Sequence, residues 1–471
     1  MSWRVDATLA LTAWGALTFG AVYPWAFLPL FAGCAVLGAG TLFFQRRRGT
    51  TVDRPLAISL ALLLAAIALQ LVPVPAGTIR WISPETDVVL RRYAVGYPGT
   101  RGAHALSMEA GATLVGLAAA GALSLVFLGL ARALTRDDTQ QIARGVCLLG
   151  VVLALAGIVQ KAMWNGKIYG FWTPIQQGES FGPFVNRNHF AGWMLMALPL
   201  AVGHFYACVA RGSRETRPGW RNRLVWFSSA HASETILVGF AVVLMALALT
   251  LTMSRSGMLA LLAALIIAAW SVARRQPTLF RRAIVAGYFV LVTVIAVGWT
   301  GFDRIAARFA ESGVAQAGGR LAIWGDTWRI VRLFPLVGTG FNTYGTATLF
   351  YQTAHLEQHF AQAHNDYLQI LAEGGVLVGV PAAIVILAVA WTVRRRFRDV
   401  SVESSGYWIR FGAVTGILAI ALQELSDFSL QMPGNAMLFV VLLAIAVRPP
   451  VEASTRLHDH RPKDLFAPHP V

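Results

Sequence analysis

The chain has 471 residues, of which 56% are hydrophobic and only 13% are charged. Soluble domains carry about 25% charged residues, so a soluble protein of this length would lack the polar surface that covers an apolar core. The net charge of +16 comes from short basic runs between long apolar stretches, and the three cysteines lie inside such stretches. These features exclude an ordinary soluble enzyme, a disulfide scaffold and a nucleic-acid-binding protein. They predict a polytopic membrane protein.

Apolar segments that are long enough to cross a bilayer recur along the whole chain. A helical span needs about 20 mostly apolar residues, and on this criterion we predict about 12 transmembrane helices. They occupy residues 7–23, 24–44, 55–75, 110–131, 142–160, 189–210, 235–253, 256–273, 283–301, 374–393, 409–428 and 433–448. The predicted fold class is therefore all-α and polytopic. No small-residue processing site follows the first apolar run, so we expect no cleaved signal peptide.

Basic residues indicate the orientation of these spans, because Lys and Arg are retained on the cytoplasmic side. Most of the 39 Lys and Arg residues are cytoplasmic if the N-terminus lies inside, so we predict that both termini are cytoplasmic. Residues 1–449 form the transmembrane domain, and 450–471 form a polar tail that we expect to be disordered. The long segments 76–109, 161–188 and 302–373 then face outward. The last is a large helical loop between spans 9 and 10, where long loops often carry function.

Four polar motifs lie at the outer ends of the predicted spans. They occupy residues 184–192, 254–257, 319–324 and 364–369, and the first three contain Arg187, Arg255 and Arg320. An arginine at the edge of an apolar span either extends to lipid headgroups or binds an anionic part of a substrate. The planar guanidinium grips phosphate oxygens in a bidentate way and keeps its proton. Three arginines on one face favour a phosphate or diphosphate site.

His364 is the strongest candidate for acid–base chemistry, because it precedes a span and histidine accepts a proton near neutral pH. Its neighbours Asn365 and Asp366 are supporting candidates, and Asp366 is also a plausible local helix cap. His355 and His359 lie close by in sequence, and with His364 they offer three zinc ligands. No second ordered cluster accompanies them, so we predict no metal and no cofactor.

Three further residues are supporting candidates. Trp324 and Trp328 are four residues apart on one side of a predicted helix, which favours interfacial anchoring, with sugar stacking as the alternative. Glu424 and Asp427 lie near the outer end of span 11, where we expect them to pair with an arginine. The sequence contains no G-x-x-x-x-G-K-[ST] loop for ATP. Any group transfer must therefore draw on an already activated donor.

At these residues the chain resembles the O-antigen ligase and O-antigen polymerase superfamily of bacterial inner-membrane glycosyltransferases. The resemblance rests on NRNHFAG (186–192), SRSG (254–257), GRLAIW (319–324), GTGFNTY (338–344) and AHNDYLQILAEGG (363–375). It covers residues 185–375, and the order and spacing of the motifs carry more weight than any one of them. The family's essential arginines map onto Arg187, Arg255 and Arg320, and its loop histidine maps onto His364.

The resemblance implies an enzyme that is inverting and independent of metal. It would move a glycan from an undecaprenyl-diphosphate carrier to a sugar hydroxyl at the periplasmic face of the inner membrane. A ligase would use lipid A core as the acceptor, as in lipopolysaccharide biosynthesis. A polymerase would use a second lipid-linked glycan and would build O-antigen or exopolysaccharide. A flippase or transporter of lipid-linked glycans is the alternative from another class, but it would place charges near the bilayer midplane, whereas these gather at one face.

Overall fold

The structure is a computed structural model that describes residues 2–43, 53–99, 102–174, 179–215, 230–273, 313–398 and 405–449. The predicted span 283–301, the first part of the predicted loop 302–373 and the tail 450–471 lie outside these described residues. The described part is mostly helical. Its one pair of strands, β1 (Pro73–Pro75) and β2 (Ala103–Ala105), is antiparallel.

The helices follow one another with short connections. They are α1 (Trp3–Leu17), η1 (Phe19–Ala21), α2 (Pro24–Phe43), α3 (Arg54–Leu69), α4 (Ala76–Ile82), α5 (Pro84–Tyr93), α6 (Ala110–Ala133), α7 (Arg136–Ala162), α8 (Arg187–Glu215), α10 (Ala230–Leu251), α11 (Arg255–Ala273), α14 (Gly313–Leu333), α15 (Tyr344–Tyr351), α16 (Asp366–Arg398), α17 (Ser405–Gln423), η2 (Ser429–Gln431) and α18 (Pro433–Val447).

Every predicted span that falls in the described residues coincides with a helix. Seven helices are long and apolar enough to cross a membrane, namely α2, α6, α7, α8, α10, α16 and α17, and α3, α11 and α18 are shorter apolar helices. The chain is therefore an all-α, multi-pass membrane protein. The number of spans and their orientation stay predictions.

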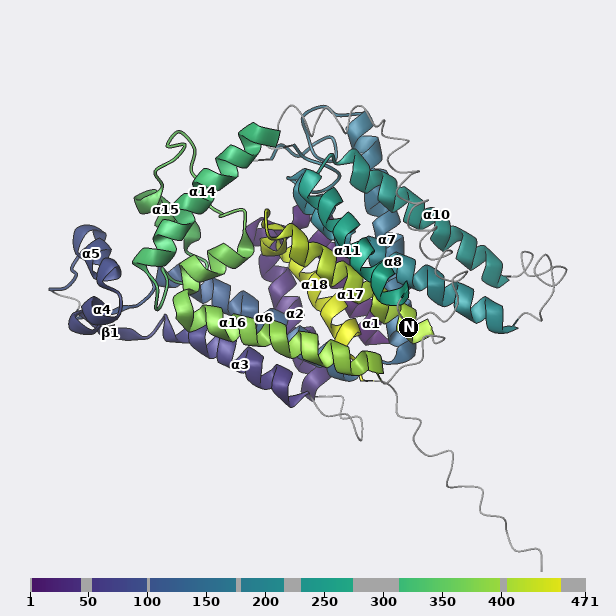
Figure 1. Cartoon of the computed structure of the whole chain (residues 1–471), viewed down its shortest axis with the longest axis horizontal. Helices are drawn as coiled ribbons and strands as arrows, with labels where there is room; N and C mark the ends of the chain where they lie inside the picture. Colours follow the sequence, from purple (N-terminus) through teal and green to yellow (C-terminus); the bar gives the residue numbers. More distant parts are fainter. Residues whose placement is uncertain are drawn as a thin grey trace, which may run out of the picture.

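The helical bundle is built around α8, which packs along α17 and α10 (Figure 1). Close approach of α8 and α17 depends on small residues, because Gly203 of α8 faces Gly412 of α17. A Cβ on either glycine would collide with the backbone of the other helix. Small residues at such crossings let membrane helices pack without a hydrophobic driving force between them. The same device joins α2 to α6 at Gly38 and Gly129.

A second group of elements lies at one end of the bundle, where Figure 1 shows α14 and α15 above and α4 and α5 to the left. Its apolar core includes Val89, Ile330, Phe334, Tyr344 and Tyr351. These elements come from the predicted outer segments 76–109 and 302–373. The long loops of the sequence are therefore folded structure with their own core.

The segment 338–344 docks this outer group onto α16. The amides of Asn342 and Tyr344 donate to the buried carboxylate of Glu373 at 2.8 and 3.1 Å. Gly338 has a φ of 67°, and a Cβ there would collide with the backbone of Glu373. The GTGFNTY motif therefore has a structural role in this chain. α16 itself is interrupted at Gly375 (φ 54°, ψ −152°), close to the predicted start of span 10.

Candidate functional site

The four polar motifs of the sequence meet at one segment, the turn between α17 and α18. We call residues 424–432 the α17–α18 turn. The Ser256 hydroxyl donates to Asp427 at 3.3 Å, and the Asn365 amide donates to the Leu425 carbonyl at 3.1 Å. The Ser429 hydroxyl donates to the Asn188 carbonyl at 3.2 Å. Arg320 of α14 also reaches this turn, so helices that are far apart in sequence contribute to one place.

Arg320 forms an ion pair with Asp427 at the base of this site. Its Nη2 lies 3.7 Å from Oδ2 of Asp427, whose side chain is fully buried while that of Arg320 is 29% exposed. The other oxygen of Asp427 accepts the amide of Phe428 at 3.0 Å. Burial raises the pKa of Asp427, and the Phe428 amide and the Arg320 charge oppose this rise. The pairing of an acid from this turn with an arginine, expected from the sequence, is present here.

His364 lies beside this ion pair. Its backbone adopts a φ of 52°, a left-handed conformation that is uncommon for a residue with a Cβ and often marks a functional site. Its ring packs edge-on against Phe428 with 4.7 Å between centroids, and the ring of His189 packs on the same phenyl group at 4.8 Å. Nδ1 of His364 is buried, and within the described residues it has no hydrogen-bond partner.

The surroundings of His364 keep its imidazole neutral. Burial, with the nearby positive charge of Arg320, lowers the pKa of His364 to about 4. A histidine with this pKa carries no charge at pH 7. The side chain is thus free of a proton to be displaced, and one ring nitrogen is without a partner in the described structure. This arrangement can accept a proton from a bound hydroxyl.

Asp366 and Glu424 form a pair of adjacent carboxyl groups on the other side of the turn. The Asp366 amide donates to the Glu424 carbonyl at 3.1 Å, and Gln431 donates to the Asp366 carboxylate at 2.6 Å. Glu424 is 1% exposed, and burial together with the negative charge of Asp366 raises its pKa well above the usual range. A hydrogen bond between two carboxyl groups requires one proton, so we infer that this pair shares a single proton at neutral pH.

The remaining predicted residues lie around this centre in different ways. Arg255 begins α11 and stands next to Ser256, whose hydroxyl donates to Asp427. Arg187 begins α8 and forms an ion pair with Glu179, so the structure gives it a partner outside the α17–α18 turn. Trp324 donates its indole N–H to the Ala363 carbonyl at 3.1 Å. Its contact is therefore a brace for the residue that precedes His364.

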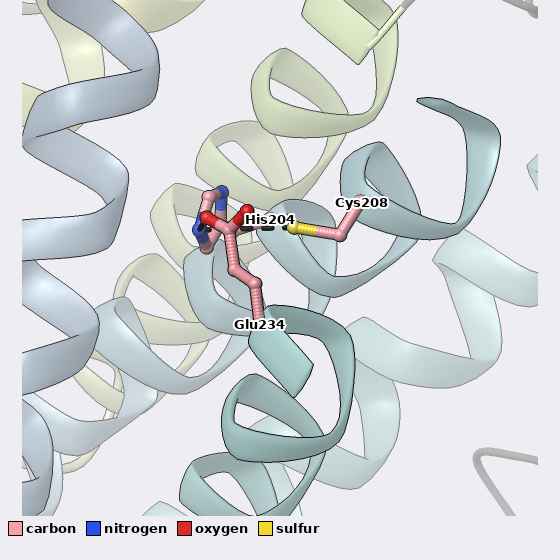
Figure 2. A group of neighbouring side chains, drawn as sticks. All are labelled: His204, Cys208 and Glu234. Carbon is pink, nitrogen blue, oxygen red and sulfur yellow. Dashed lines mark hydrogen bonds and ion pairs between the residues drawn. The ribbon is translucent and has the colours of Figure 1, made fainter. Parts of the chain in front are cut away.

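The three histidines considered as a zinc site do not gather in the described part of the chain. His359 Nε2 lies 2.8 Å from the Gly345 carbonyl, and His355 pairs with Glu357 on the exposed surface. The residues that do cluster with metal-ligand spacing, among those the structure describes, are His204, Cys208 and Glu234 (Figure 2). The sequence signal for that cluster is the four-residue spacing of His204 and Cys208, which places both on one helix face.

Sequence reasoning also missed Phe428 and Gln431. An apolar ring and an amide in a short turn carry no local pattern, and only the contacts with His364 and Asp366 reveal them.

Comparison with protein families agrees with the motifs. Residues 240–383 match the model of the O-antigen ligase family. This range runs from α10 into α16 and includes Arg255, Arg320 and His364, whereas the motif at 184–192 and the α17–α18 turn lie outside it. A search of curated proteins found no match. The family match shows that this chain belongs to the O-antigen ligase and polymerase superfamily.

Proposed function

We propose that the chain is a glycosyltransferase that moves a glycan from an undecaprenyl-diphosphate carrier to a sugar hydroxyl of lipid A core. The observation that carries this proposal is the meeting of Arg320, Asp427 and His364 at the α17–α18 turn. Family membership supports ligase- or polymerase-type activity with lipid-linked glycan and lipid A core partners in general. The positions of these groups at helix starts support an active site at one face of the membrane, which the topology rule predicts to be periplasmic.

The chemistry requires a cation where the diphosphate leaves. The acceptor oxygen bonds to the anomeric carbon while the bond from that carbon to the diphosphate oxygen breaks, and its electron pair moves to the leaving group. One guanidinium about 4 Å from a phosphate oxygen gains roughly 4 kcal/mol at an effective dielectric constant of 20. Arg320 and Arg255 supply this stabilisation, and Arg187 contributes to holding the donor. Only the part of this attraction that grows in the transition state accelerates the transfer.

The acceptor hydroxyl must lose its proton as the new bond forms, and His364 takes this proton on a ring nitrogen. Its low pKa keeps that nitrogen unprotonated at neutral pH. General bases of this kind contribute about 10²–10⁴-fold to a rate. A displacement with the hydroxyl and the diphosphate on opposite sides of the anomeric carbon inverts its configuration.

A polymerase is the second candidate, because the same groups serve a lipid-linked acceptor equally well. A transporter would need charged residues or broken helices near the bilayer midplane. Arg255 and Asp366 instead begin α11 and α16 at the helix ends. This placement favours a transferase over a flippase.

The deciding experiment offers two acceptors to the purified protein in vesicles. The donor is an undecaprenyl-diphosphate glycan, and the acceptors are lipid A core and a second lipid-linked glycan. Extension of lipid A core supports the ligase, and extension of the lipid-linked acceptor supports the polymerase. His364→Ala is the matched control for enzymatic transfer. Donor movement across the vesicle bilayer without any extended acceptor would overturn the transferase proposal.

A further inference from the structure

A second cluster of reactive side chains lies far from the proposed transferase site. His204 and Cys208 stand one turn apart on α8, and Glu234 comes from the beginning of α10; all three are drawn in Figure 2. The 16 residues between Asn188 and His204 place the cluster about 24 Å along α8 from the α17–α18 turn. It therefore belongs to the opposite end of the bundle.

The three ligand atoms face one another. His204 Nε2 lies 3.9 Å from Glu234 Oε1 and 4.0 Å from Cys208 Sγ, and all three ligand atoms lie within 4.8 Å of each other. Bonds of about 2.0–2.3 Å to zinc place tetrahedral ligands roughly 3.3–3.8 Å apart. Small rotations of Glu234 and Cys208 would bring the set to that spacing.

The imidazole of His204 gives an independent reason to expect a ligand. The residue is only 2% exposed, and its Nδ1 has no hydrogen-bond partner within the described part of the chain. Its Nε2 meets the thiol and the carboxylate only at the long distances given above. Buried polar groups are nearly always satisfied, so a buried imidazole aimed at two anionic ligand types fits a metal-binding role.

We propose that His204, Cys208 and Glu234 bind a zinc ion that joins α8 to α10. Imidazole, thiolate and carboxylate are the ligand types that zinc takes, and three protein ligands leave a fourth position for water. Binding releases the Cys208 proton to solvent, because the thiolate is the ligand. The site is separate from the diphosphate chemistry proposed above and does not depend on it.

Neighbouring arginines set the expected strength of this site. Arg211 donates to Cys208 Sγ at 3.2 Å, which favours the thiolate, and its Nη2 lies 3.8 Å from the second oxygen of Glu234. This leaves Oε1 of Glu234 directed to His204. Arg144 adds a second positive charge nearby. Two positive groups oppose a divalent cation, so the zinc should exchange and be removable by a chelator.

Cobalt and zinc titrations of the purified, chelator-treated protein test the proposal. Co²⁺ bound to a thiolate gives a near-ultraviolet charge-transfer band, and Zn²⁺ displaces it. We expect one ion per chain, with an affinity that rises about tenfold per pH unit, because one thiol proton is released. The band should vanish in Cys208→Ser, and Glu234→Gln should keep the band while binding at least about tenfold more weakly.

Cys34→Ser is the matched control, because Cys34 is also a buried thiol but contacts Met437 on the other side of the bundle. It should bind cobalt like the unaltered protein. Elution as a single species in size-exclusion chromatography identifies variants that remain folded, and Glu234→Gln serves if Cys208→Ser does not. A missing thiolate–cobalt band in the unaltered protein would overturn the proposal. So would a band that survives in folded Cys208→Ser.

Discussion

Replacing Asp427 by asparagine tests whether Arg320 depends on its buried partner for the transfer. The change keeps the size of the side chain and an oxygen for the Phe428 amide, but it removes the negative charge that lies 3.7 Å from the guanidinium. We expect Arg320 to lose its fixed position while keeping its charge. Transfer should therefore slow, whereas donor binding should stay the same or tighten, because the carboxylate no longer competes with the diphosphate.

The size of the effect follows from distance and exposure. At an effective dielectric constant of 20, two unit charges 3.7 Å apart attract by about 4 kcal/mol. The side chain of Arg320 is 29% exposed, so water recovers part of this energy. Breaking fully buried pairs costs about 3–5 kcal/mol and exposed pairs about 1 kcal/mol. We expect a loss of about 2 kcal/mol, which corresponds to a roughly 30-fold lower rate.

Single-turnover transfer from a lipid-diphosphate glycan measures this rate, and equilibrium binding of the donor is measured beside it. Asp53→Asn is the matched control, since Asp53 pairs with Arg395 at 2.6 Å near the other end of α16. That variant should transfer normally. Equal losses in both variants would mean that breaking any ion pair weakens the protein. An unchanged rate in a folded Asp427→Asn protein would refute the positioning role.

Three further predictions concern the arginines, the base and the topology. Arg255→Lys should fail nearly as badly as Arg255→Ala in transfer assays, because an ammonium lacks the bidentate fork; recovery of most activity with lysine would leave only a requirement for positive charge. His364→Ala should bind donor normally but transfer about 10²–10⁴-fold more slowly, with a residual rate that rises with pH. In the unaltered protein, the limb due to His364 should fall only as pH approaches its lowered pKa of about 4, because the imidazole stays neutral above it; a fall near the ordinary histidine value would contradict this. Cysteine labelling should reach position 352 from the periplasm and position 396 from the cytoplasm, and the reverse pattern would invert the proposed topology.

Much of the fold follows from composition and periodicity. Continuous apolar runs must form helices in lipid, because every backbone group has to be satisfied within its own segment. The predicted spans therefore coincide with helices wherever the chain is described. The outer group was harder to foresee, because its core depends on contacts such as Val89 with residues of α14 and α15. The buried bonds of Glu373 to the 338–344 segment have no local signature either.

The candidate site divides in the same way. Arg320, Asp427 and His364 stood out because charged or titratable groups are costly beside apolar spans. Which acid pairs with which arginine depends on how α14 meets the α17–α18 turn, and sequence spacing does not encode this. Arg187 shows the limit, since the sequence grouped it with the other arginines while the structure pairs it with Glu179. The metal-type cluster was missed because Glu234 reaches His204 from a different helix.

The Arg320–Asp427 pair also explains how one arginine can serve the transition state more than the ground state. Before the reaction, the carboxylate offers Arg320 a fixed negative charge at 3.7 Å. A diphosphate that displaces it exchanges one anion for another, so the net gain on binding is small. As the glycosyl bond breaks, charge builds on the leaving oxygen, while the charge of Asp427 stays constant. The guanidinium is then drawn further toward the leaving group, and this extra attraction is the part that lowers the barrier. An arginine held by a buried acid is therefore better suited to the proposed reaction than one held by solvent.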